Sequence, residues 1–127
     1  MTMSNYLEDA VANALRGNSA GTSFTAPTHV YVKLHTGDPG EAGTSNAAGN
    51  TTRQEAIFGA SSGGVITTTA DVTWTSVSTS ETYSHVSLWD NSSAGNCLGS
   101  GALTASKAVN SGDTFTISSG SLTYTFD

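Results

Sequence analysis

Apolar and polar residues alternate along most of this chain, and the pattern predicts a protein built mainly from short β-strands. Alternation is clearest in 29–36, where Val30, Val32 and Leu34 fall on one strand face and polar side chains on the other. Further short segments of this kind follow at regular spacing, separated by turns rich in Gly, Ser, Asn and Asp. They cover 53–58, 65–69, 71–75, 84–90, 97–104, 114–118 and 121–126. We therefore expect an antiparallel β-sandwich, jelly-roll-like in type, over residues 29–127.

One segment has a helical period instead. Apolar residues recur there at the spacing of one helix face, and the pattern predicts an amphipathic helix over 4–17. The stripe consists of Tyr6, Leu7, Ala10, Val11, Ala14 and Leu15. Asn5 and Glu8 have the spacing of a capping box, and Gly17 followed by Asn18 predicts the end of the helix. We expect a single domain made of this helix and the β-sandwich.

A long polar loop, 37–52, is predicted after the first strand of the sandwich. It opens with Asp38, Pro39 and Gly40, which is strong turn chemistry because proline presets φ and glycine accepts a positive φ. Most of the residues that follow are Gly, Ala, Ser, Thr and Asn. Loops of this length in so small a domain are usually functional or mobile, so we expect this one to be presented for contact.

Composition narrows the choice of partners. Of the 127 residues, 36% are hydrophobic and 11% charged, which indicates a thin core rather than a charge-rich disordered chain. The net charge is −6, and the basic residues Arg16, Lys33, Arg53 and Lys107 are scattered along the sequence. Nucleic acid is therefore not an expected partner, because phosphate binding needs a basic patch. Without an apolar run long enough to cross a bilayer or a secretory signal pattern, we expect a soluble chain made in a cytoplasm.

The residues that resemble catalytic motifs have simpler structural interpretations. The segment 59–63 matches the G-x-S-x-G pattern of hydrolases, but that motif works at a strand-to-helix turn and here both flanks predict strands. Ser61 is therefore assigned to a turn. Cys97 has no charged neighbour in sequence and is expected to pack in the core. The acids Glu55, Asp71, Glu81 and Asp90 have no spacing that marks a carboxylate pair.

The three histidines do not predict a metal site. His29 and His35 fall on the same strand face but about 20 Å apart at the rise of a strand, so they cannot share an ion. A site built from His85 with Asp71 or Asp90 stays open, although the spacing does not specify it. We expect surface or half-buried histidines, and no catalytic residue, metal or other cofactor.

Taken in order, several short segments give the chain a family resemblance over nearly its whole length. These are 6–9 (YLED), 24–27 (FTAP), 31–40 (YVKLHTGDPG), 52–54 (TRQ), 101–104 (GALT) and 122–127 (LTYTFD). In them the chain resembles a family of small structural proteins of tailed bacteriophages, often labelled tail fibre or minor tail proteins. The resemblance implies a non-catalytic virion protein and supplies no catalytic residue.

Within that class we expect a capsid decoration (cement) protein that binds and stabilises the head shell. The alternatives are a tail fibre or minor tail protein involved in host attachment, and a module that binds or cleaves host polysaccharide. The expected partners are the major capsid protein or other virion subunits, with the chain homo-oligomeric or bound in a lattice. Whether the helix packs on its own domain or on a partner stays open at this point. The residues assigned to the subunit interface are Tyr6, Leu7, Val11, Leu15, Asp38, Pro39 and Glu41.

Overall fold

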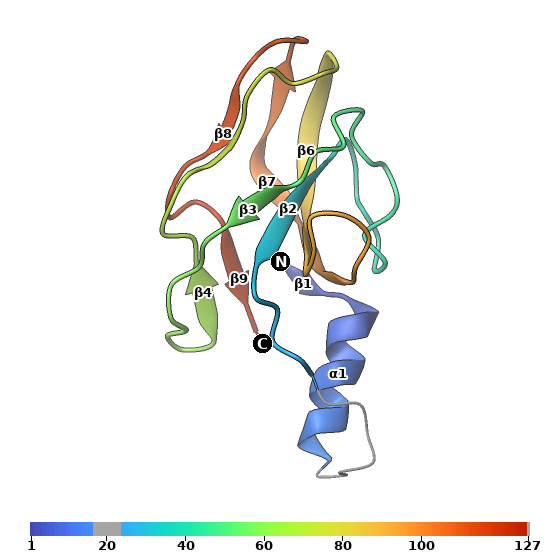
Figure 1. The fold of residues 1–127 in the computed structure, drawn as a ribbon, viewed down its shortest axis with the longest axis vertical. Coiled ribbons are helices and arrows are strands. Elements are labelled where there is room, and N and C mark those ends of the chain that lie inside the picture. The colour runs from blue at the N-terminus through green and yellow to red at the C-terminus, as the bar shows by residue number, and fades with distance from the viewer. Residues whose placement is uncertain (17–23, 127) are drawn as a thin grey trace.

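The described part of the chain, residues 1–16 and 24–126 of a computed structural model, forms nine strands and one helix (Figure 1). In chain order the elements are β1 (Thr2–Met3), α1 (Asn5–Leu15), β2 (Val30–His35), β3 (Gln54–Ala56), β4 (Val65–Thr67), β5 (Val72–Trp74), β6 (Glu81–Trp89), β7 (Cys97–Val109), β8 (Phe115–Ile117) and β9 (Thr123–Thr125). The body is mainly β, and α1 extends away from one end of it (Figure 1).

The first layer is a five-stranded antiparallel sheet in the order β1-β7-β6-β2-β3. Its central register aligns Val32 with Leu88 and Leu34 with Val86. All four side chains are almost fully buried, because the alternation predicted from the sequence turns them toward the second layer. The inward face of the first predicted strand is thus confirmed.

The second layer is a narrow antiparallel ribbon. Strand β4 pairs with β9, and β5 pairs with β8. Between the two pairs, the backbone N–H of Thr68 donates to the carbonyl of Leu122 at 3.0 Å, so the ribbon continues from one pair to the next. Val72 and Trp74 of β5 are each 1% exposed and pack toward the first sheet. The predicted fold class, antiparallel and mainly β with one helix, is confirmed.

Strand β7 is longer than its predicted segment and irregular. Its register with β6 aligns Tyr83 with Lys107 but His85 with Ala102, so residues 103–106 of β7 lie opposite the single residue Ser84. This is a large β-bulge on the edge side of the sheet, and residues 104–108 are all exposed. The sequence pattern predicted only the regular first half of β7.

The helix begins at Asn5, and its N-cap lies one residue earlier than predicted. Ser4, not Asn5, is the N-cap: its backbone is extended, and its hydroxyl oxygen accepts the backbone N–H of Leu7 at 3.2 Å. The described helix ends at Leu15 with Arg16 as its C-cap. The predicted stop at Gly17 and Asn18 lies outside the described residues.

Candidate contact surface

Large apolar side chains that are exposed gather mainly at the α1 end of the molecule, with Ile57 as an exception after β3. Among the described residues, those with the largest exposed fractions are Leu15 (86%), Ile57 (55%), Val11 (44%), Phe126 (41%), Tyr6 (39%) and Phe24 (37%). Three of these lie on α1. Phe24 and Phe126 line a pocket that also includes Leu7 of α1. Apolar side chains that the fold leaves in water together at one end make that end a candidate contact surface.

Only the first turn of α1 is anchored in the body. Leu7 is 5% exposed and belongs to the hydrophobic core. Ser4 is 2% exposed, and its hydroxyl donates to the carbonyl of Cys97 at the start of β7. The backbone N–H of Ser4 also donates to the carbonyl of Leu98, at 3.3 Å. The helix is therefore fixed at its root, while its second half projects from the sheets.

The residues predicted for an interface divide into two groups. Tyr6, Val11, Leu15, Asp38 and Glu41 are exposed and available to a partner. The other two, Leu7 and Pro39, are buried by the chain's own residues. Helical periodicity placed Leu7 in the apolar stripe. It did not show that the start of the stripe is buried in the core while the rest of it is exposed to solvent. We retain the five exposed residues as a prediction.

Loop 37–52 is tied to the sheet rather than loose. The backbone N–H groups of Thr36 and Ala48 donate to the carbonyls of Asn46 and Leu34, at 2.9 and 3.1 Å. Both carboxylate oxygens of Glu81 accept loop backbone N–H groups, at 2.9 and 3.1 Å. The loop therefore covers one end of the outer sheet face as a fixed element. The expectation that it is presented for contact stays a prediction.

The loop covers a buried polar network that the sequence did not reveal. His35 is 0% exposed, which corrects the expectation of a surface or half-buried histidine. Its Nδ1 lies 2.9 Å from the carbonyl oxygen of Ser45, and its Nε2 lies 2.7 Å from Oγ of Ser87. Nε1 of Trp89 donates to the same Ser87 oxygen at 2.7 Å. A carbonyl only accepts, so we assign a neutral ring with the proton on Nδ1 and the Ser87 hydroxyl donating to Nε2.

This network predicts a loss of stability in mild acid. Burial lowers the pKa of His35 below its ordinary value of 6.5, and the nearby Lys33 and His85 lower it further. The hydrogen bond to the Ser45 carbonyl raises the pKa, but burial outweighs it. The unfolded chain therefore binds a proton at a pH where the folded chain does not. The contribution of His35 to the free energy of unfolding is therefore at its full value above pH 6.5, and it decreases as the pH falls toward the pKa of His35 in the folded chain. Urea unfolding between pH 7.5 and about 4.5, where histidines take up protons, tests this result. A stability that is flat across this range in the parent, or an equal slope in His35→Gln, would contradict it.

Three hollows lined by described residues lie along the sheets. The first, of ≈ 380 Å³, lies between the first turn of α1, loop 37–52 and the turn after β6. Its walls include Tyr6 and Glu41, so two predicted contact residues from distant segments do come together. Asp38 is not among them, because its carboxylate accepts the N–H of Gly40 at 2.9 Å in a local turn.

The second hollow, which we call the apolar pocket, has a volume of ≈ 170 Å³. It opens beside the root of α1, between the connector to β2 and strands β4 and β9. Its walls are Leu7, Phe24, Pro27, Val30, Phe58, Ile66, Leu88, Leu98, Tyr124 and Phe126. The rings of Tyr124 and Phe126 stack with centroids 4.4 Å apart. Phe126, at the end of the predicted strand 121–126, is 41% exposed and lies at the edge of this pocket.

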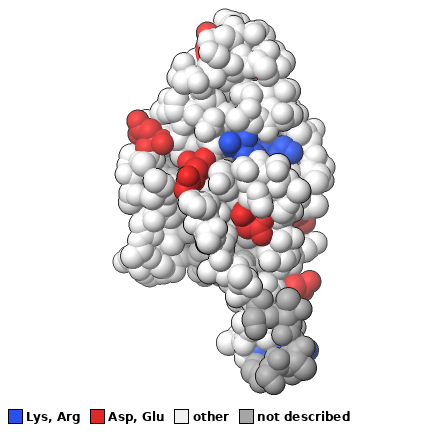
Figure 2. Space-filling view, viewed as in Figure 1, with Lys and Arg blue, Asp and Glu red and all other residues white. Residues whose placement is uncertain are grey.

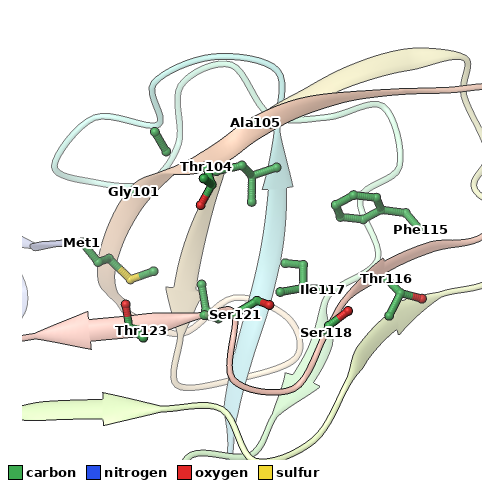
Figure 3. A pocket seen from close by; sticks show the side chains of 13 residues that line it. Met1, Gly101, Thr104, Ala105, Phe115, Thr116, Ile117, Ser118, Ser121 and Thr123 are labelled. Atoms are coloured by element: carbon green, nitrogen blue, oxygen red, sulfur yellow. The ribbon is translucent and has the colours of Figure 1, made fainter.

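The third hollow is a groove of ≈ 400 Å³ between β7 and the β8–β9 side of the ribbon (Figure 3). Strand β1 pairs with β7 only at Gly99 and Ser100, so among the described strands the outer edge of β7 is unpaired from Gly101 onward. Met1 closes one end of the groove, and none of the lining side chains is charged. The groove is an open strand edge that the bulge in β7 makes irregular.

Charged side chains are sparse over the body (Figure 2). Lys33 and Arg53 both lie over the ring of Trp89, with the guanidinium carbon 4.0 Å from a ring centroid. Nη1 of Arg53 also donates to the carbonyls of Asn91 and Ala94, at 2.8 and 2.7 Å. This arginine therefore has a structural role, since it holds the turn after β6 against the sheet.

The residues considered as candidates for a catalytic or metal site lie apart from one another or make structural contacts. Segment 59–63 lies in a hairpin in which the backbones of Ser62 and Val65 bond to each other, not at a strand-to-helix turn. Nδ1 of His29 pairs with Glu55 at 2.7 Å on the surface. Across residues 1–16 and 24–126, no group of three or more His, Cys, Asp or Glu is placed to hold a metal ion. No helix within these ranges is long and apolar enough to cross a membrane.

Comparison with known proteins supplies the class of the protein. A family model described as podophage GP4 fiber I protein gp80 matches residues 2–125. This match defines the chain as a fibre-type structural protein of a bacteriophage particle. Because it spans nearly the whole chain, the protein belongs to the Gp80 family. No curated protein sequence matches significantly. The family bears out the resemblance found in the sequence, and it supports the fibre alternative rather than the expected capsid decoration.

Proposed function

We propose that this protein is a non-catalytic structural subunit of a bacteriophage fibre, held in the particle by contacts at its α1 end. Membership of the fibre protein family supports the first part. The second part is carried by one observation: α1 is anchored only at its root, while Val11 and Leu15 farther along it are 44% and 86% exposed. An amphipathic helix whose apolar residues face water is stable in this form when a partner covers them.

The location of the protein on the particle tests its assignment to a fibre. Antibody labelling of intact phage, followed by electron microscopy, should place the protein on fibres in a small number of copies. Labelling spread over the whole head surface would instead support capsid decoration and overturn the fibre assignment.

Replacing Leu15 by lysine is expected to prevent incorporation into particles without unfolding the protein. Leu15 is 86% exposed, so the substitution leaves the core intact, but it puts a charge into the contact that we propose. Phage lacking the natural gene would be complemented with each variant, and purified particles would be probed for the protein. Thr104→Lys, on the exposed edge of β7, is the matched control and should be incorporated normally. Normal incorporation of Leu15→Lys would contradict the role of α1.

A further inference from the structure

The free part of α1 presents a narrow apolar stripe, formed by Val11 and Leu15. Residues four apart lie on the same helix face, and small alanines on either side allow another helix to approach closely. Beyond the first turn the helix lies clear of both sheets (Figure 1). The stripe therefore fits a partner helix better than it fits a broad surface.

The charges of α1 are complementary to those of its own antiparallel copy. Glu8 and Asp9 lie near the start of the helix, and Arg16 lies at its end. In an antiparallel pair, Arg16 of each copy lies beside Glu8 of the other, and opposite helix dipoles meet. In a parallel pair, acidic side chains would face acidic ones. The charge pattern therefore favours the antiparallel arrangement. Because the acidic and the basic residues are on the same helix, it also favours a second copy of this chain as the partner.

The apolar pocket lies where such a partner would place its Leu15. The helix rises about 12 Å from Leu7 to Leu15 at 1.5 Å per residue, so antiparallel pairing centred on Val11 brings the partner's Leu15 beside Leu7. Leu7 is one wall of the apolar pocket, whose volume is ≈ 170 Å³. A cavity of about 150 Å³ with similar walls accommodates benzene, so the pocket has room for one leucine side chain.

We infer that α1 pairs antiparallel with α1 of a second copy about a two-fold axis, with Leu15 of each copy in the apolar pocket of the other. Each copy then supplies the same stripe and the same pocket, as a closed two-fold interface requires. The inference rests on the proposed function in one respect: it takes the α1 end as the contact surface and names its partner. Two short helices bury little area, so we expect a dissociation constant on the order of 10–100 µM in solution.

Sedimentation velocity over a concentration series tests the dimer directly. The full-length parent chain is expected to shift from monomer to dimer over this concentration range. Leu15→Lys should stay monomeric, whereas the control Thr104→Lys should dimerise like the parent. Circular dichroism checks that each variant is folded. A parent chain that is monomeric throughout, or a Leu15→Lys variant that still dimerises, would overturn the inference.

A charge exchange tests the antiparallel arrangement. Arg16→Glu and Glu8→Arg should each weaken dimerisation about five-fold or more, because each dimer loses two attractive pairs and gains two repulsive ones. The double variant should recover most of the affinity, and added salt should reduce both effects. If the double variant instead loses as much affinity as the two single variants together, the antiparallel geometry is contradicted.

Incorporation into particles separates this inference from the proposed function. If the parent is monomeric but Leu15→Lys is excluded from particles, the contact role of α1 stands and its partner is a different subunit. If the parent dimerises through α1 but both lysine variants are incorporated alike, the dimer stands and the contact role in the particle fails.

Discussion

Gly99→Val is expected to detach β1 and the root of α1 from the sheet and to lower the free energy of unfolding by about 3 kcal/mol. A Cβ atom at Gly99 would lie 2.5 Å from the hydroxyl oxygen of Tyr124 and 2.7 Å from the carbonyl oxygen of Thr2. Neither neighbour moves easily. The Tyr124 hydroxyl donates to the carbonyl of Leu98 at 2.9 Å, and Thr2 belongs to the strand that pairs with β7.

The effect should be local as well as global. Hydrogen exchange is expected to show faster exchange in residues 2–8 of Gly99→Val, even in conditions where the sheet stays protected. Ala102→Val lies on the same strand at an exposed position and is the matched control, for which we expect a change within about 0.5 kcal/mol. If the two variants had equal stability, β7 would tolerate a side chain at Gly99 and the described packing would be incorrect.

His35→Ala is expected to destabilise the fold by about 3 kcal/mol and to release loop 37–52. The change removes a fully buried ring, so the Ser45 carbonyl loses its side-chain donor and the Ser87 hydroxyl loses its acceptor while keeping its bond from Trp89. Urea unfolding gives the stability, and limited proteolysis reports whether the loop opens. His35→Ala should be cut within the loop at protease concentrations that leave the parent intact.

His29→Ala is the control for this prediction. The side chain of His29 is 56% exposed and pairs with Glu55 on the surface, so its loss should cost less than about 0.5 kcal/mol. Equal destabilisation by the two histidine variants would show that burial of His35 is not what holds the loop.

Local sequence pattern accounts for most of the framework. Alternation placed Val32 and Leu34 on the inner face of β2, and helical spacing located α1. It missed β1, because two residues are too few to show a period. The sequence pattern also could not show that Ser4, rather than Asn5, is the N-cap. Both residue types cap helices well, and the contact between Ser4 and Cys97 of a distant strand selects between them.

The outer face of the sheet shows where pattern ceases to be informative. His35 alternates correctly to the polar side of β2, and a polar side normally faces water. It is buried because loop 37–52 folds back over it, held by Glu81 from β6, and such a contact has no local signal. For the same reason the pattern did not show that Leu7 and Pro39 are covered. Nor did it assign Phe24 and Phe126 to the contact surface.

The bulge in β7 has a consequence for how this domain can vary. Residues 103–106 lie opposite a single residue of β6, so the two halves of β7 hold their registers independently of each other. Extra residues added at this point would lengthen the exposed bulge without shifting the register of either half of β7. The bulge is thus a natural position for length differences between relatives, and for a peptide inserted for display.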